Sequence, residues 1–169
     1  MSHPYPPHNP DLPYVGKQRY FLTFCANERE RTFEEDADVQ LAYAQFLRAA
    51  CRYRFEVFAY CFMPDHVHLI VAGQSDESDC LAFIKAAKQY SGYYFAQSHG
   101  RTLWQRYGFE RVLRDDRELW TTVAYILANP VRAGIVAHPS EYRHLGSTRY
   151  TIEQLIEMSD YERFAADLV

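Results

Sequence analysis

The residues of this chain with the clearest chemical potential are two histidines separated by one valine in the segment FMPDHVHLIV (62–71). The segment is rich in β-branched and apolar residues and predicts a strand. Side chains alternate between the two faces of a strand, so His66 and His68 project from one face and Val67 from the other. Two adjacent imidazoles can bind a divalent cation, although in isolation a hydrogen-bonded histidine pair on a half-buried strand is the commoner arrangement.

A tyrosine and an asparagine four residues apart form a second candidate pair. Apolar residues recur at helical spacing in DDRELWTTVAYILANP (115–130), and this spacing places Tyr125 and Asn129 together on a stripe away from the main apolar face. Because the position before a proline disfavours the α conformation, Pro130 predicts that Asn129 is the last helical residue. A phenol and a carboxamide would then stand together at a helix end.

These four side chains together suit the transfer of a phosphodiester. Two histidines and one oxygen ligand can hold a divalent cation with open coordination positions, as a Lewis-acid site requires. A free phenol, with a pKa of about 10, is a weak nucleophile at neutral pH. A cation that stabilises the phenolate and polarises a phosphodiester would make attack on phosphorus feasible. The products would be a phosphotyrosine ester and a free hydroxyl, and a second hydroxyl could reverse the step without ATP.

The elements that must position these residues follow from periodicity and turn signals. The expected order is β-α-β-β-α-β followed by a further helix, which is the ferredoxin-like pattern of an α+β fold with a central antiparallel sheet. Two short helices are expected near the end of the chain. The expected strands are 19–27, 55–62, 66–73 and 109–114, and the expected helices are 36–52, 80–97, 115 or 116 to about 129, 151–157 and 160–167.

Length and composition favour one main domain with a segment at each end. The 169 residues suit a single domain of roughly 100 to 200 residues. Five of the eight prolines lie within residues 1–16, which predicts a flexible proline-rich arm, followed by a main domain over 17–145 and a C-terminal helical extension over 146–169. No apolar run approaches the ~20 residues that span a bilayer, and the start does not resemble a signal peptide, so we expect a cytoplasmic protein.

The four cysteines do not predict a metal knuckle or a disulfide framework. They are far apart, form no CxxC pair and fall within apolar or helical patterns. We therefore expect all four to be reduced residues of the core, namely Cys25, Cys51, Cys61 and Cys80.

Three segments resemble a known family of DNA-processing proteins. His66-Val67-His68 looks like the HUH motif (histidine, bulky hydrophobic, histidine) of the single-tyrosine transposases. The segment ERVLRDDRELWTTVAYILANPVRAGIV (110–136) is similar to their catalytic-helix region, especially in REP-associated tyrosine transposases, and LWQRY (103–107) looks like the link into the fourth strand. The resemblance covers about residues 17–145. The element order and the spacing of the two motifs agree with it.

The resemblance implies a role for each residue already singled out. Tyr125 matches the nucleophile, His66 and His68 match two metal ligands, and Asn129 matches the third, polar ligand. The implied metal is Mg²⁺ or Mn²⁺, and the implied partner is single-stranded DNA, often beside a hairpin. Asp65 departs from the family pattern, in which asparagine is common before the first histidine.

The charge distribution allows a DNA-binding face on a protein of net charge −4. Residues 85–149 carry ten basic and five acidic side chains, whereas the rest of the chain carries eight basic and seventeen acidic ones. Solvated helix surfaces alone would give the same asymmetry about half the time. The candidates for phosphate contacts are Lys85, Lys88, Arg101, Arg106, Arg111, Arg114 and Arg132, and Tyr93, Tyr94, Trp104 and Tyr107 are candidates for stacking on unpaired bases.

The leading interpretation is a metal-dependent single-stranded DNA endonuclease and strand transferase that forms a 5′-phosphotyrosine intermediate at hairpin or repeat DNA. The alternatives are a domesticated module that binds hairpin DNA or structured RNA with residual or no catalysis, and a small metallohydrolase in which water is the nucleophile. The sequence does not distinguish a monomer from a homodimer.

Overall fold

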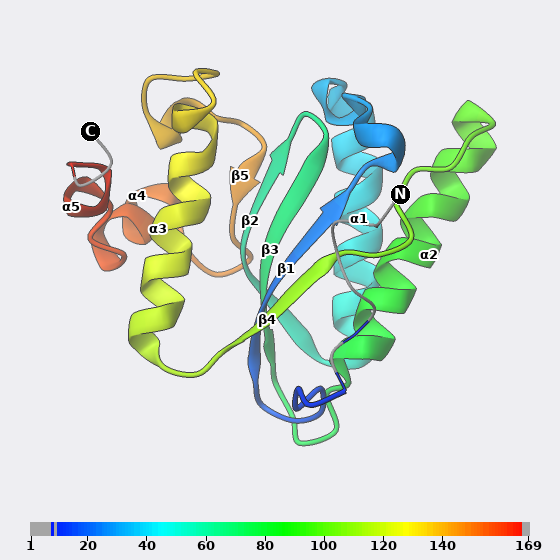
Figure 1. Cartoon of the computed structure of the whole chain (residues 1–169), viewed down its shortest axis with the longest axis horizontal. Coiled ribbons are helices and arrows are strands. Elements are labelled where there is room, and N and C mark those ends of the chain that lie inside the picture. Colours follow the sequence, from blue (N-terminus) through cyan, green and yellow to red (C-terminus); the bar gives the residue numbers. More distant parts are fainter. Residues whose placement is uncertain (1–7, 9, 167–169) are drawn as a thin grey trace.

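A five-stranded antiparallel sheet forms the centre of the molecule, with helices on both of its faces (Figure 1). The computed structural model describes residue 8 and residues 10–166. The strands are β1 (Arg19–Cys25), β2 (Phe55–Met63), β3 (His66–Gly73), β4 (Phe109–Leu113) and β5 (Leu145–Gly146), in the spatial order β4-β1-β3-β2-β5. The helices are α1 (Asp36–Tyr53), α2 (Cys80–His99), α3 (Asp116–Arg132), α4 (Ile152–Met158) and α5 (Tyr161–Ala166), with 3₁₀ turns η1 (Asn27–Arg29), η2 (Thr32–Glu34) and η3 (Pro139–Glu141).

The first four strands and two helices confirm the predicted ferredoxin-like arrangement within an α+β fold. They follow in the order β1-α1-β2-β3-α2-β4, and β1 and β3 are the neighbouring central strands. The short strand β5 was not predicted, and it extends the sheet beside β2. Because β4 pairs only with β1 in this sheet, β4 forms one edge.

The alternation of side chains along the strands divides the core into two parts. Leu22, Phe24, Val67 and Leu69 belong to the part under α1 and α2. The opposite face contributes Phe21, Cys61 and Ile70 to a second part, which includes Val123 and Leu127 of α3 and residues of α4 and α5. Figure 1 shows α1 and α2 on one side of the sheet and α3, α4 and α5 on the other. The even-numbered positions of β3 from 66 to 70 therefore face α3.

An aspartate side chain caps the start of α3. The Asp115 carboxylate accepts a hydrogen bond from the Glu118 backbone N–H at 2.8 Å, so it satisfies one of the free donors in the first turn. Asp79 caps α2 in the same way through the N–H of Ala82 at 3.0 Å.

The predicted end of α3 was wrong, because the helix continues through Pro130 to Arg132. Proline removes one backbone donor, but the turn after it is closed by the following loop. The N–H of Ala133 bonds the carbonyl of Asn129 at 3.0 Å, and the N–H of Ile135 bonds the carbonyl of Pro130 at 2.9 Å. Pro130 is also buried. Asn129 is consequently an interior helical residue.

The described parts of both predicted end segments pack on the domain. In the arm, Leu12 and Tyr14 contact the core and Val15 pairs with Asp79, whereas residues 1–7 and 9 lie outside the described part of the chain. The predicted boundary at residue 145 falls inside β5. The two predicted C-terminal helices are present as α4 and α5, and Leu155 and Tyr161 are buried in the core part under α3.

The prediction that all four cysteines are buried was wrong for one of them. Cys25, Cys61 and Cys80 are buried and free, but Cys51 is exposed in the last turn of α1. Its helix stripe turns away from the sheet, which the apolar character of the neighbouring residues did not reveal. Among the described residues, no helix is both long and apolar enough to cross a membrane.

Candidate active site

The two histidines lie side by side on the face of β3 that α3 covers. His68 is buried and His66 is partly buried, and their Nε2 atoms face each other at 3.1 Å. Antiparallel pairing places Thr23 of β1 opposite His68 and Cys25 opposite His66. Strand alternation therefore predicted the shared face of the histidines correctly, and the sheet holds the two rings in contact.

The Nδ1 atom of each histidine contacts a further residue, and the two Nε2 atoms face each other. The Thr23 hydroxyl lies 2.8 Å from Nδ1 of His68. Nδ1–H of His66 donates to the Asp65 carboxylate at 2.6 Å, and Arg29 Nε lies 2.8 Å from the other carboxylate oxygen. Such outer contacts fix the orientation and tautomer of a ligating imidazole. Sequence reasoning did not find Thr23 or Arg29, because neither belongs to the motif.

Electrostatics keep both imidazoles neutral near pH 7. Burial lowers the pKa of His68 to about 3, with a further contribution from neighbouring His66. Burial also lowers the pKa of His66, although its bond with Asp65 opposes this effect. Burial alone would raise the pKa of Asp65, but the His66 hydrogen bond and the Arg29 guanidinium hold it below its usual value. Neutral imidazoles are the form that binds a metal.

Helix α3 brings the other two predicted residues to the histidines. The Asn129 side chain lies near the His68 ring and acts to raise the pKa of that imidazole, while its amide nitrogen donates to the Tyr125 carbonyl at 2.7 Å. The carboxamide oxygen is therefore the atom left for the imidazole. The Tyr125 ring lies edge-on to His68 with 5.6 Å between centroids, and Phe21 contacts both rings. All four predicted residues thus meet on one face of the sheet.

The spacing of the two imidazole donors suits an octahedral divalent cation. Mg²⁺ keeps octahedral ligands at ~2.0–2.1 Å, so neighbouring donors at ~90° are about 3 Å apart, which matches the 3.1 Å between the two Nε2 atoms. The described residues contain no group of three or more His, Cys, Asp or Glu side chains that could hold a metal. A third protein ligand would therefore be of another type, as the Asn129 carboxamide is.

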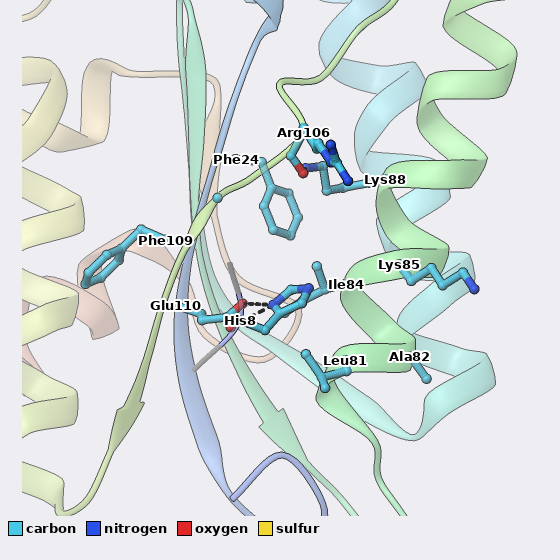
Figure 2. A pocket seen from close by; sticks show the side chains of 11 residues that line it. His8, Phe24, Leu81, Ala82, Ile84, Lys85, Lys88, Arg106, Phe109 and Glu110 are labelled. Atoms are coloured by element: carbon cyan, nitrogen blue, oxygen red, sulfur yellow. Dashed lines mark hydrogen bonds and ion pairs between the residues drawn. The ribbon is translucent and has the colours of Figure 1, made fainter. Parts of the chain in front are cut away.

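Three of the predicted DNA-contact residues gather at a pocket on the other face of the sheet. Lys85, Lys88 and Arg106 line a hollow of about 480 Å³ between α2 and β4, with Phe24 and Ile84 also in its lining (Figure 2). Lys88 Nζ donates to the carbonyls of Gln105 at 2.7 Å and Arg106 at 3.0 Å, and burial lowers its pKa to about 8. Lys88 thus ties α2 to the link before β4, whereas Lys85 and Arg106 are exposed.

The remaining predicted basic residues are distributed over several surfaces. The guanidinium of Arg132 lies 6.0 Å from the Tyr125 ring centroid, and Arg111 bonds the Thr122 hydroxyl at 3.0 Å. Both therefore flank the candidate nucleophile. Arg101 forms an ion pair with Glu30, and Arg114 is exposed just after β4.

The predicted stacking aromatics differ in exposure. Trp104 is buried, and its indole N–H donates to Ser91 at 2.8 Å, so its ring belongs to the core. Tyr93 and Tyr94 are exposed on α2. Tyr107 is half-buried, and the guanidinium of Arg106 lies over its ring.

The fold is that of a REP-associated tyrosine transposase. A solved REP-associated tyrosine transposase, bound to a REP hairpin, superimposes with a TM-score of 0.68 at 22% identity, over 86% of this chain and 82% of the other. A Deinococcus radiodurans protein assigned as a transposase gives a TM-score of 0.50 at 20% identity, over 72% of this chain and 97% of the other.

Sequence comparison places the chain in a family. Residues 14–129 match the family model for IS200-like transposases, and the chain therefore belongs to that family. A Haemophilus influenzae protein assigned as a REP-associated tyrosine transposase is 28% identical over 138 residues, which cover 69% of this chain and 72% of the relative. The resemblance inferred from the HVH and YILANPVRAG segments is thereby confirmed.

Proposed function

We propose that this chain is a metal-dependent single-stranded DNA endonuclease and strand transferase with Tyr125 as its nucleophile. The observation that carries the proposal is the meeting of α3 with the histidine strand. The Tyr125 ring contacts His68 at 5.6 Å between centroids, and Asn129 of the same helix lies near the same imidazole. Membership of the IS200-like transposase family supports the proposal.

In the proposed reaction, three residues bind the metal and Tyr125 attacks the phosphate. His66, His68 and Asn129 would hold Mg²⁺ or Mn²⁺, which when bound supplies positive charge to the phosphate under attack. The phenol oxygen of Tyr125 attacks phosphorus and loses its proton to solvent. The bond from phosphorus to the 3′ oxygen breaks, and that oxygen takes up a proton. The products are a 5′-phosphotyrosine ester and a 3′-hydroxyl end, and a hydroxyl from another strand end can reverse the step.

We infer that the substrate is a single strand at hairpin or repeat DNA. The solved relative is bound to a REP hairpin. In this chain, Arg111 and Arg132 lie beside Tyr125, and Lys85 and Arg106 are exposed at the pocket across β4. Cations at these positions can contact phosphates on either side of the attacked one.

The test is the formation of a covalent adduct. End-labelled oligonucleotides that join a hairpin to a single strand, including repeats from the flanks of its own gene, are incubated with the protein and Mn²⁺ and run on a denaturing gel. The wild type should give a labelled protein band, Tyr125→Phe should give none, and EDTA should prevent the band. Tyr93→Phe, which alters an exposed tyrosine on α2, should behave as the wild type.

A domesticated protein that binds hairpins without cleaving them is the second candidate. It is favoured by the solved relative, which is bound to a REP hairpin. Specific hairpin binding by the wild type, with no Tyr125-dependent adduct on any oligonucleotide, would support this candidate over the enzyme.

A further inference from the structure

A second, largely apolar hollow adjoins Tyr125 and is not used by the chemistry described above. It measures about 320 Å³ and collects residues from four elements. Phe21 comes from β1, Phe109 and Arg111 from β4, Tyr125 and two threonines from α3, and Phe164 from α5. Three phenylalanines thus line a hollow that the candidate nucleophile also lines.

These rings differ in exposure, and Phe109 is the most exposed of the three phenylalanines. Phe21 lies at the base, where it is 7% exposed and contacts Tyr125 edge-on at 6.0 Å and Phe109 edge-on at 5.9 Å between centroids. Phe109 is 38% exposed and lies at the start of the edge strand β4. Figure 2 shows Phe109 and Glu110 projecting to opposite sides of β4, with Phe109 directed away from the pocket beside α2. A partly exposed ring therefore borders the hollow next to Tyr125.

The charges around the hollow match the chemistry of a nucleotide. Arg111 lies on the same side of β4 as Phe109, two positions along, and it is exposed although it also bonds Thr122. Arg132 lies over the Tyr125 ring. An aromatic hollow between two arginines offers a stacking surface for a base and cations for the phosphates on both sides of it.

We propose that this hollow receives the unpaired base next to the phosphate that Tyr125 attacks, with Phe109 as its stacking surface and Phe164 of the C-terminal helix as a side wall. The inference rests on the proposed function and adds a substrate subsite to it. Phe109 is a positioning residue: stacking holds the adjoining base, and this fixes the phosphate relative to the phenol. Every base has a π face, so the subsite tolerates any base but requires one.

The test removes the base and the ring separately and together. In oligonucleotides that give an adduct, each of the two nucleotides adjoining the cleaved phosphate is replaced by an abasic residue. One replacement should lower adduct formation by roughly 5- to 150-fold, the range that stacking of one base on one aromatic side chain supplies. Phe109→Ala should cause a similar loss on intact DNA and no further loss on the abasic DNA, because both changes remove one interaction.

Three further variants separate stacking from structural damage. Phe109→Tyr keeps the ring and should retain adduct formation, and Leu47→Ala removes an exposed apolar side chain on α1 and should have no effect. Phe164→Ala should give a smaller loss than Phe109→Ala. The affinity of the Tyr125→Phe variant for the same oligonucleotides, measured by fluorescence anisotropy, gives a readout that does not depend on cleavage.

The outcomes distinguish the subsite from the proposed function. Adducts whose yield is indifferent to both adjoining bases and to Phe109 would overturn the subsite and leave the function intact. If the two losses multiply when the abasic residue and Phe109→Ala are combined, the two changes act independently, and the subsite would also be overturned. If no adduct forms, but binding depends on Phe109 and on a single base, the hollow binds a base and the enzyme proposal fails. If no adduct forms, and binding depends neither on Phe109 nor on either base, both the subsite and the proposed function are overturned.

Discussion

Thr23 and His68 are cross-strand partners in the β1–β3 pair, and the threonine hydroxyl lies 2.8 Å from Nδ1 of the imidazole. With Nδ1 occupied, Nε2 is the ring atom that faces His66 at 3.1 Å. The orientation of a predicted metal ligand is therefore set by a residue that lies 45 positions earlier in the chain. The contact between Thr23 and His68 therefore depends on the register in which β1 pairs with β3, and not on the HVH segment alone.

Thr23→Val should weaken metal binding without altering the fold. The substitution keeps the branched shape but removes the hydroxyl, so the His68 ring loses its fixed orientation. Loss of an outer-shell partner typically lowers metal affinity by about 10- to 100-fold, and titration of Mn²⁺ by electron paramagnetic resonance would measure it. Thr148→Val removes a hydroxyl that bonds the Val57 carbonyl away from the site and serves as the control. Equal Mn²⁺ affinities for both variants would contradict this role of Thr23.

The buried imidazole should make the metal-free protein less stable in mild acid. The pKa of His68 is lowered to about 3 by burial, whereas an unfolded histidine titrates near ~6.5. Between these values the unfolded state binds the proton and the folded state does not, so stability falls as pH falls from about 6.5. His68→Gln removes this term. Between pH 6 and pH 5, the free energy of unfolding in urea should fall less for His68→Gln than for the wild type. The difference between the two falls should be up to about 1.4 kcal/mol, the value for one proton over one pH unit. Parallel pH profiles for the variant and the wild type would refute the assignment.

Lys85 and Lys88 should differ in their effect on DNA binding, although both were candidates for phosphate contacts. Lys88 is committed to the carbonyls of Gln105 and Arg106, whereas Lys85 is exposed at the rim of the pocket. Lys85→Met should reduce the slope of log affinity against log salt by about 0.7 to 0.9, the value for one phosphate contact. Lys88→Met should leave the slope nearly unchanged and raise hydrogen exchange over 101–108. A larger slope change for Lys88→Met would reverse these roles.

The predictable parts of the fold and site were those encoded by local periodicity. Strand alternation alone placed His66 and His68 on one face, and a spacing of four placed Tyr125 beside Asn129 on α3. Both patterns depend only on the geometry of one element. The resemblance then joined the two elements, and the structure brings all four side chains together.

The parts that escaped prediction depend on contacts between distant segments. Thr23 and Arg29 reach the histidines only through the pairing of β1 with β3 and the loop after β1. The continuation of α3 past Pro130 depends on carbonyls bonded by the next loop. The second hollow needs Phe164 from α5, which lies far along the chain from Phe21. Local sequence carries no signal for any of these contacts.

The described part of the C-terminal extension should be required for stability. Leu155 of α4 is fully buried in the core part under α3, so Leu155→Ala should lower the free energy of unfolding by about 2 to 5 kcal/mol. Met158→Ala, at a 45% exposed position of the same helix, is the control and should change it little. Urea unfolding measures both. An unchanged stability for Leu155→Ala would contradict a contribution of α4 to the stability of the domain.

Asp65 should act on the metal site through the orientation of His66. Its carboxylate lies between Nδ1 of His66 at 2.6 Å and Nε of Arg29 at 2.8 Å. Asp65→Asn keeps an oxygen that can accept from Nδ1–H, so Mn²⁺ affinity should fall by no more than about 10-fold, and adduct formation should persist. Asp65→Ala removes the acceptor, and its affinity should fall towards the roughly 100-fold end of such losses.

The two Asp65 variants separate the hydrogen bond from the negative charge. If orientation of the imidazole is the contribution of Asp65, the asparagine variant resembles the wild type and the alanine variant does not. If Asp65→Asn is as impaired as Asp65→Ala, the charge itself raises the basicity of His66 and the orientation argument fails. Glu34→Gln, at an exposed acid that pairs with Arg31, controls for a general change in charge, and it should leave Mn²⁺ affinity unchanged because Glu34 contacts neither histidine.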